Sequence, residues 1–432
     1  MMKRKIIIKN IIITLIILIL TGLTVSCGFI SRQSSDRQSP LDIDISDRDI
    51  ADNEINNKDD LNEEIKSEEQ APEDLPEEPP KPTGKTTLTI SVVGDIMAHM
   101  PQVDAARQDD GTYDFKPVFQ DVKPYLEKAD IAMGNLETTI SNDEIGYTGY
   151  PRFRTPEAIL EALKYAGFDV ITTANNHSLD GVEFGVENTL NKLDEYGFLH
   201  TGTARSPEER EQVLIVEKND IKIAILAYTY GTNGMEAAVD KEKLTYMVNY
   251  LNDEARIKQD IKKAREQGAE VVIGCIHWGD EYVRQPSDTQ KQIADRLFSY
   301  GMDIIFGSHP HVLQPMDRKT ITDPDGSERE VFVIYSLGNF VSNQRDRYRD
   351  SGVILNLEIV KDYDAQTVGL GKIDYIPTWV HKYTENGKLH YRILPVADYM
   401  DQNLIGDAEQ RIKEVWHETT QHLNNDQIRA RE

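Results

Sequence analysis

Short polar clusters follow five apolar runs of the chain, and their residue types are those that bind divalent metal ions. The clusters are Gly94-Asp95, Gly134-Asn135-Leu136-Glu137, Ala174-Asn175-Asn176-His177-Ser178-Leu179-Asp180, His277-Trp278-Gly279-Asp280-Glu281 and Gly307-Ser308-His309-Pro310-His311. A centre of two ions about 3.5–4 Å apart needs oxygen donors and imidazoles, with one ligand shared between the ions. We therefore predict a metal site with the ligands Asp95, Asn135, Glu137, Asn176, His277, His309 and His311.

This donor set does not select one metal, because it mixes nitrogen and oxygen ligands and contains no thiolate. Manganese, iron and zinc all suit such ligands. Each residue alone has an ordinary structural explanation: an Asn after a strand is usually part of a turn, and a buried His usually makes a structural hydrogen bond. The recurrence of polar clusters after five runs is what favours a common site.

The elements that must position these residues follow from the pattern of apolar residues. Seven apolar runs predict buried strands: Leu88–Val93, Ile131–Met133, Val170–Thr173, Ile221–Ala227, Val271–Ile276, Ile304–Phe306 and Val331–Tyr335. Between them, apolar residues spaced about 3.6 apart predict helices at Pro156–Ala166, Val182–Tyr196, Asp253–Gln267 and Ser287–Tyr300. This alternation is typical of a layered α/β fold, in which ligands bind at the carboxyl ends of the strands.

The last part of the chain has a different pattern. Gly352–Val360, Gly371–Thr378 and Tyr391–Val396 have strand character with no helix between them, which predicts a second, partly antiparallel sheet. A final helix is expected at Asp407–Leu423. We expect residues 346–432 to complete the same domain as residues 86–345.

The net charge of −26 is distributed unevenly over the 432 residues. Residues 1–35 carry +5 and residues 36–80 carry −13, which leaves −18 for residues 81–432. An acidic folded part argues against nucleic acid as a partner, because nucleic-acid binding requires a basic surface. The acidic segment contains no aromatic residue and ends in prolines, so we expect residues 28–85 to form a disordered linker.

Residues 1–27 are typical of an export signal, with basic residues before an apolar stretch and small residues after it. Leu23-Thr24-Val25-Ser26-Cys27 resembles a bacterial lipobox, whose cysteine becomes the lipidated first residue, although Thr24 departs from the usual aliphatic residue. An uncleaved signal anchor and simple secretion are the alternatives, because about 18 apolar residues can span a bilayer. All three interpretations place the rest of the chain outside the cytoplasm. A lipidated Cys27 or an uncleaved signal anchor would also attach it to the cell membrane.

The order and spacing of the polar motifs resemble those of the capsule-synthesis protein CapA family over roughly residues 88–345. Gln314-Pro315 and Tyr335-Ser336-Leu337-Gly338-Asn339-Phe340 extend the likeness. The resemblance implies a membrane-anchored protein of poly-γ-glutamate capsule synthesis or export. The CapA family in turn resembles calcineurin-like metallophosphoesterases, which implies an α/β fold of two sheets in a sandwich flanked by helices.

The likeness to metallophosphoesterases also implies roles for individual residues. His177 matches the catalytic histidine, and the matches to metal ligands are Asp95, Asn176, His277, His309 and His311. Two positions depart from the pattern. Met97 stands where the first motif has a histidine, and Asn135-Leu136-Glu137 replaces the region of the bridging aspartate. The resemblance therefore implies one or two ions, with Glu137 able to bridge them.

The implied mechanism is activation of water, whose pKa falls towards about 7 when it binds a metal ion. His177 is expected to act as a general acid or to stabilise developing negative charge. Asp180 either orients His177 or caps the following helix. Arg152 and Arg154 are candidates to bind an anionic substrate, with ordinary surface charge as the alternative.

Three functions remain open at this point. The first is a metal-dependent hydrolase of a phosphoester or of an amide bond in poly-γ-glutamate. The second is a non-catalytic component of a membrane synthesis or export complex, and the third is a general metallophosphoesterase. A folded part of charge −18 repels an anionic polymer over a Debye length of about 8 Å, so contact must run through the metal or a local basic patch.

Overall fold

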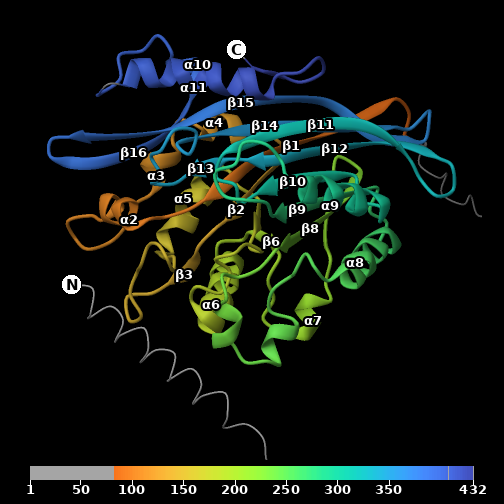
Figure 1. Cartoon of the computed structure of the whole chain (residues 1–432), viewed down its shortest axis with the longest axis horizontal. Coiled ribbons are helices and arrows are strands. Elements are labelled where there is room, and N and C mark those ends of the chain that lie inside the picture. The colour runs from red at the N-terminus through yellow and green to blue at the C-terminus, as the bar shows by residue number, and fades with distance from the viewer. Residues whose placement is uncertain (1–81, 407, 432) are drawn as a thin grey trace, which may run out of the picture. The chain divides into compact units, whose positions relative to one another are not determined.

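Two β-sheets lie face to face in the computed structural model, which describes residues 82–406 and 408–431 (Figure 1). The first sheet has the order β16-β15-β14-β1-β2-β5-β6, with β13 beside β1 and β17 beside β15. Its strands are β1 (Lys85–Ile96), β2 (Ile131–Leu136), β5 (Val170–Thr172), β6 (Leu199–Thr201), β13 (Asn339–Val341), β14 (Ser351–Asp362), β15 (Thr367–Glu385), β16 (Lys388–Pro395) and β17 (Arg429–Ala430).

The second sheet has the order β11-β12-β10-β9-β8-β7. Its strands are β7 (Leu214–Lys218), β8 (Ile221–Thr229), β9 (Val271–His277), β10 (Ile304–Ser308), β11 (Leu313–Thr322) and β12 (Glu328–Leu337). The strands that lead into the polar clusters run parallel to one another in each sheet: β1, β2 and β5 in the first, and β9 and β10 in the second. Their carboxyl ends therefore lie at a common edge.

The core between the sheets follows from the alternation of side chains along each strand. Leu88, Ile90 and Val92 of β1 point towards the second sheet, where they join a buried cluster with Ile304 and Phe306 of β10. The intervening residues of β1 point to the opposite face, because successive side chains in a strand alternate. A shift of one residue would turn Leu88, Ile90 and Val92 away from this core, and their burial therefore fixes the register of β1.

Helices cover the outer face of each sheet. The first sheet is covered by α2 (Met100–Ala106), α3 (Lys116–Phe119), α4 (Lys123–Leu126), α5 (Ala158–Ala166) and α6 (Val182–Glu195). The second is covered by α8 (Glu254–Glu266) and α9 (Asp288–Ser299). Ile412 and Val415 of α11 (Ala408–Leu423) pack with Trp379 and Leu394 of β15 and β16, and Figure 1 shows α11 running along β15.

Capping residues explain where several helices begin and end. Ser287 Oγ accepts a hydrogen bond from the Gln290 amide at 3.2 Å, and the Gln290 side chain accepts one from the Ser287 amide, which forms a capping box at the start of α9. At the start of α8 the Asp253 side chain accepts a hydrogen bond from the Arg256 amide at 3.1 Å. Gly167 ends α5 with φ of 96°, a left-handed conformation that favours glycine.

The predicted two-sheet sandwich flanked by helices is confirmed, and each of the seven predicted strands is present. The expectation that the three late strands form a second sheet is wrong, because β14 pairs antiparallel with β1, and β15 and β16 follow it in the first sheet. The apolar pattern of a strand does not reveal which strand it pairs with. β15 is also longer than predicted and covers 19 residues. The sequence pattern missed β11, which pairs antiparallel with β12. Polar residues fill the second half of β11, so it lacks the apolar run by which the other strands were found.

The proposals for the N-terminus concern residues outside the described part of the chain. The lipobox at Cys27, the signal or anchor at residues 1–27 and almost all of the linker at residues 28–85 lie there. In residues 82–406 and 408–431, no helix has the length and apolar character needed to cross a membrane.

Gly94, the residue before Asp95, lies so close to the backbone of Gly338 that no larger residue fits there without a backbone shift. A Cβ atom at position 94 would lie 1.9 Å from the backbone oxygen of Gly338, which accepts the Asp95 amide at 3.0 Å. We expect Gly94→Ala to lower the free energy of unfolding by about 3 kcal/mol, because the backbone must move. Denaturant unfolding of the full-length protein measures this. Gly369→Ala, where a Cβ meets nothing within 4 Å, is the control, and an equal loss in both variants would contradict the explanation.

Candidate metal centre

The predicted ligands converge at the carboxyl ends of parallel strands from both sheets. Asp95 lies near the end of β1, Glu137 directly follows β2, and His277 is the last residue of β9. His309 and His311 directly follow β10. All seven predicted ligands are buried: Asp95, Asn135, Glu137, Asn176, His277, His309 and His311. Residues more than 200 positions apart in the sequence thus share one site.

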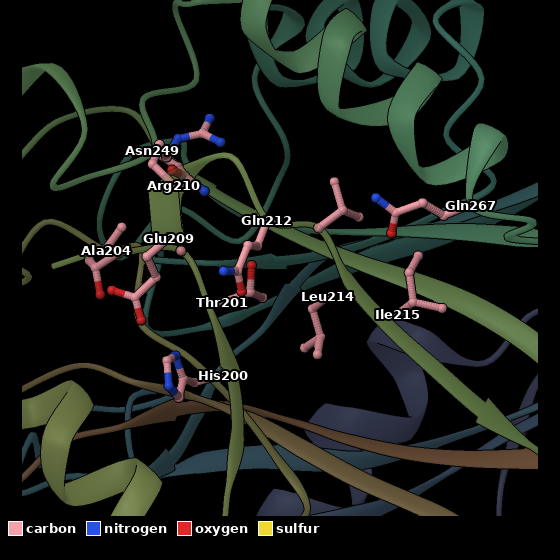
Figure 2. A pocket seen from close by; sticks show the side chains of 13 residues that line it. His200, Thr201, Ala204, Glu209, Arg210, Gln212, Leu214, Ile215, Asn249 and Gln267 are labelled. Carbon is pink, nitrogen blue, oxygen red and sulfur yellow. The ribbon is translucent and has the colours of Figure 1, made fainter. Parts of the chain in front are cut away.

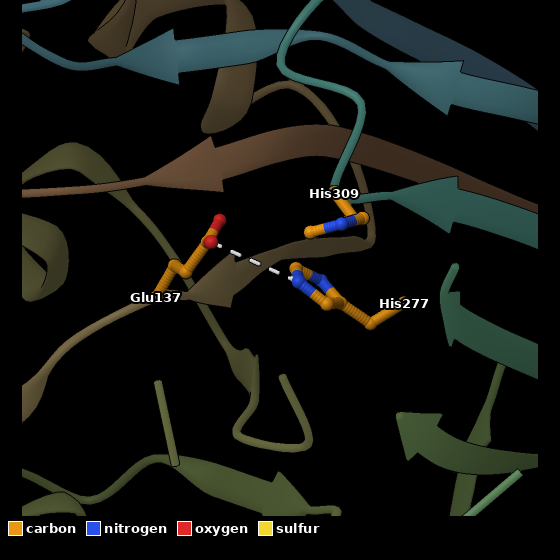
Figure 3. Close-up of side chains that lie close together, drawn as sticks. All are labelled: Glu137, His277 and His309. Atoms are coloured by element: carbon orange, nitrogen blue, oxygen red, sulfur yellow. Dashed lines mark ion pairs between the residues drawn. The ribbon is translucent and has the colours of Figure 1, made fainter. Parts of the chain in front are cut away.

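Glu137 is the clearest sign that a cation belongs here. Its side chain is fully buried, and neither carboxylate oxygen has a hydrogen-bond partner. The Nε2 atom of His277 lies 3.7 Å from Glu137 Oε1 (Figure 3), and the Nε2 atom of His311 lies at the same distance. Burial raises the pKa of Glu137 well above its usual value, and the charge of Asp95 adds to the rise. A buried carboxylate without partners is costly, and a metal ion offsets that cost.

Three groups of side chains have ligand atoms within 4.8 Å of one another and could hold an ion. The groups are Glu137-His277-His309, Asp95-Glu137-His311 and Glu281-His309-His311. Glu137 belongs to two of them, and this sharing is what a ligand that bridges two ions requires.

The imidazoles are in the form that binds metal. Burial lowers the pKa of His277 well below its usual value and lowers that of His309 to about 4, and neighbouring histidines add to both shifts. Neutral imidazoles are the ligating species. His309 Nδ1 is buried without a hydrogen-bond partner. His309 and His311 also have φ of 96° and 56°, and such strained backbone persists where the surrounding structure imposes it, often at functional sites.

Asp95 organises one side of the centre. Its Oδ1 accepts a hydrogen bond from Asn135 Nδ2 at 2.9 Å, and its Oδ2 lies 3.1 Å from His311 Nδ1. Burial alone would raise the pKa of Asp95, but the contacts with His311 and Asn135 outweigh it and hold the pKa below its usual value. Asp95 is therefore an ionised carboxylate at the base of the site.

The two asparagines predicted as ligands are engaged with other site residues. Asn135 Oδ1 accepts from Asn175 Nδ2 at 3.1 Å, so Asn135 links Asp95 to the loop after β5. Asn176 Oδ1 lies 2.9 Å from His277 Nε2. Their ligation of a metal stays a prediction.

His177 and Asp180 form a buried pair beside these ligands. His177 Nδ1 lies 2.6 Å from Asp180 Oδ2, which also accepts the Phe153 amide at 2.6 Å. Gly181, not Asp180, is the N-cap of α6, and no side chain caps this helix end. Of the two explanations for Asp180, the contacts thus favour orientation of His177.

The two predicted substrate-binding arginines lie beside this pair. Arg152 is exposed, and Arg154 is half-buried with Nη2 3.5 Å from the backbone oxygen of Asp180. Among residues 82–406 and 408–431, neither guanidinium forms an ion pair. Both charges therefore remain available to an anion.

Three residues of the site were not predicted as site residues, although two of them stand in motifs quoted from the sequence: Glu281, Tyr230 and Asn339. Glu281 completes one of the three groups, the Tyr230 ring centroid lies 4.7 Å from that of His309, and Asn339 Oδ1 lies 3.1 Å from His311 Nδ1. Tyr230 and Asn339 directly or nearly follow β8 and β12. The rule that site residues follow strands therefore also predicts Tyr230 and Asn339 when it is applied to β8 and β12.

A separate cavity of about 290 Å³ lies beside the edge strands β6 and β7 (Figure 2). Its lining includes Thr201, Arg210, Gln212 and Asn249, and none of the predicted site residues. The Arg210 guanidinium is buried and paired with Asp260 at 3.0 Å, so its charge is already compensated. The candidate functional site therefore remains the cluster of buried ligands at the strand ends.

Comparison with known proteins identifies relatives over most of the folded part. The profile of a family described as "Bacterial capsule synthesis protein PGA_cap" matches residues 89–344. The chain is 27% identical to a capsule biosynthesis protein CapA of Bacillus anthracis over 74% of this chain and 72% of that protein. It is 30% identical to the PGA biosynthesis protein CapA of Bacillus subtilis (strain 168) over 69% and 73%.

Solved structures include a calcineurin-like phosphoesterase of Bacillus subtilis, with 14% identity and a TM-score of 0.33 over 78% of this chain and 97% of that one. The family match and the two curated relatives confirm the resemblance that the strand-end motifs predicted.

Proposed function

Because the chain belongs to the family of bacterial capsule synthesis proteins described as PGA_cap, we propose that it is a metal-dependent hydrolase acting in poly-γ-glutamate capsule synthesis or export. One observation carries the hydrolase part: Glu137 is buried with both oxygens unpartnered beside His277, His309 and His311. A bound cation offsets the cost of burying this carboxylate. The chemistry that a divalent ion supplies there is activation of water at neutral pH.

Residues of the chain supply proton donation, orientation of the proton donor and binding of the anionic substrate. His177 donates a proton to the leaving group through Nε2, because Asp180 occupies Nδ1. Asp180 fixes the ring, with its own position held by the Phe153 amide. Arg152 and Arg154 attract a carboxylate or phosphate of the substrate.

The test is cleavage by the full-length protein, stripped of metal and then supplied with Mn²⁺, Fe²⁺ or Zn²⁺. Poly-γ-glutamate is followed by its chain length and bis-p-nitrophenyl phosphate by released nitrophenolate. We expect metal-dependent shortening of the polymer. Metal binding without cleavage of either substrate would contradict the hydrolase and support the second candidate.

That second candidate is a non-catalytic component of a polymer synthesis or export complex. The observation in its favour is Met97, which is buried and offers no ligand where metallophosphoesterases have a histidine. A centre that lacks one ligand can still bind a metal while holding the polymer or a partner protein.

Asp180→Asn is expected to lower kcat for hydrolysis about 10- to 100-fold while KM and metal content stay unchanged, because the variant loses the charge that orients His177. Steady-state kinetics and metal analysis measure the two effects. Asp194→Asn, which removes an exposed carboxylate beside His200, is the matched control. A fall in metal content equal to the fall in rate would show that Asp180 acts on the ligands and not on His177.

We further propose that the protein works at the outer face of the bacterial cell membrane, attached through lipid on Cys27. Growth of the producing cells with an alkyne fatty acid should label wild type and leave Cys27→Ala unlabelled. Absence of label on wild type would favour the signal anchor or simple secretion.

A further inference from the structure

Three exposed tyrosines lie around the metal centre: Tyr230 and Tyr282 contact site histidines directly, and Tyr150 contacts His177 through the ring of Phe153. We propose that Tyr150, Tyr230 and Tyr282 form a rim that binds an extended anionic polyamide chain, so that the site selects a polymer over a small ester. This inference rests on the proposed function and deepens it, because it names the residues that hold the polymer outside the metal centre.

Tyr230 and Tyr282 lie over the histidines of the centre. Tyr230 is 46% exposed, and its ring centroid lies 4.7 Å from that of His309. Tyr282 is 39% exposed, and its ring centroid lies 6.1 Å from that of His311. Each ring thus has one face against a predicted ligand and part of its surface in solvent.

Tyr150 occupies the side of His177. It is 78% exposed, and its ring centroid lies 6.5 Å from that of Phe153, which in turn contacts His177 at 4.7 Å and His99 at 4.9 Å.

Guanidinium groups accompany the rings. The Arg349 guanidinium lies 3.4 Å from the centroid of the Tyr282 ring, although Asp346 at 2.7 Å shares its charge. Arg152, two residues after Tyr150, is exposed and has no ion-pair partner in the part of the chain that the structure describes. These cations stand out in a folded part whose net charge is −18. Glu281 is the opposing charge at the rim, and an ion held by His309 and His311 would neutralise it.

The combination of tyrosine rings and guanidinium groups indicates which kind of molecule binds the rim. Methylene and amide groups of a polyamide pack on tyrosine faces, and its carboxylates pair with guanidinium groups. Several weak contacts along one chain add, so affinity must increase with chain length until the rim is filled. A small ester reaches the metal centre alone and gains nothing from the rim.

Chain-length dependence of binding therefore tests the rim. Fluorescein-labelled γ-glutamyl chains of about 2 and about 20 residues are titrated with the full-length, metal-loaded protein, and anisotropy gives Kd. We expect the longer chain to bind wild type at least about tenfold more tightly. The double variant Tyr150→Ala/Tyr230→Ala should lose most of this preference, while Tyr165→Ala, a tyrosine of similar exposure on α5, should keep it.

Tyr282 is left unchanged because the Arg349 guanidinium stacks on its ring, so its removal would also release a cation of the rim. Equal affinity of wild type for both lengths, or an unchanged length preference in the double variant, would overturn the rim and leave the hydrolase proposal standing. Failure of the metal-loaded wild type to bind either chain would overturn the polymer as substrate, and the rim with it.

Discussion

Glu137→Gln is expected to stabilise the metal-free protein and to remove most of the stabilisation that a divalent metal provides. In the metal-free protein Glu137 is a buried carboxyl group with no hydrogen-bond partner and a raised pKa, so folding at neutral pH must either bury its charge or protonate it. A neutral amide avoids that cost and should raise the free energy of unfolding by about 1–3 kcal/mol. In wild type, metal at 100 times its Kd adds about 2.7 kcal/mol by linkage. The variant lacks the ligand shared by two of the three groups, so it should gain much less.

Thermal unfolding in EDTA and in excess Mn²⁺ or Zn²⁺ measures both effects on the same two proteins. Glu266→Gln, which alters an exposed glutamate on α8, is the control and should behave as wild type in both conditions. A Glu137→Gln protein that is less stable than wild type in EDTA, yet stabilised equally by metal, would mean that Glu137 is a structural residue.

His177→Ala is expected to lower the rate of hydrolysis about 10²- to 10⁴-fold, the usual contribution of a general acid or base, with no loss of metal. The expectation follows from its geometry: His177 is buried and oriented by Asp180 at 2.6 Å, but belongs to none of the three ligand groups. Cleavage rate and metal content, measured on one preparation, separate the two roles.

The exposed His417→Ala serves as a control for loss of an imidazole away from the site. If His177→Ala loses metal in proportion to its rate, His177 acts on the centre itself. If the rate is unchanged, proton transfer by His177 is not part of the reaction.

Much of the site could be predicted because each ligand stands directly after an apolar strand. Asp95 and His277 were found in this way, and the parallel arrangement of their strands brings them to one edge. The sequence placed distant residues in one site, but it could not predict which of them contact one another. His311 reaches Asp95 across 216 residues, and it does so through a backbone of positive φ that no spacing rule anticipates.

The rim was missed for a different reason. Tyr150 and Tyr282 lie in loops, where no periodicity indicates which side chains face a site. Glu281 is exposed, and an exposed carboxylate after a strand is usually part of a solvated turn. β11 was missed for a similar reason. Its second half pairs with β12 but is mostly polar, so no apolar pattern indicates a strand there.

Metal content of the full-length protein tests the metal centre most directly. Wild type, His309→Ala and His417→Ala are stripped with chelator, reloaded with Mn²⁺, Fe²⁺ or Zn²⁺, passed through a desalting column and analysed by mass spectrometry of the metals. We expect one or two ions per chain in wild type and in His417→Ala, and a clear loss in His309→Ala, because His309 belongs to two of the three ligand groups. Wild type that retains no metal above background would contradict the metal centre and the hydrolase proposed from it.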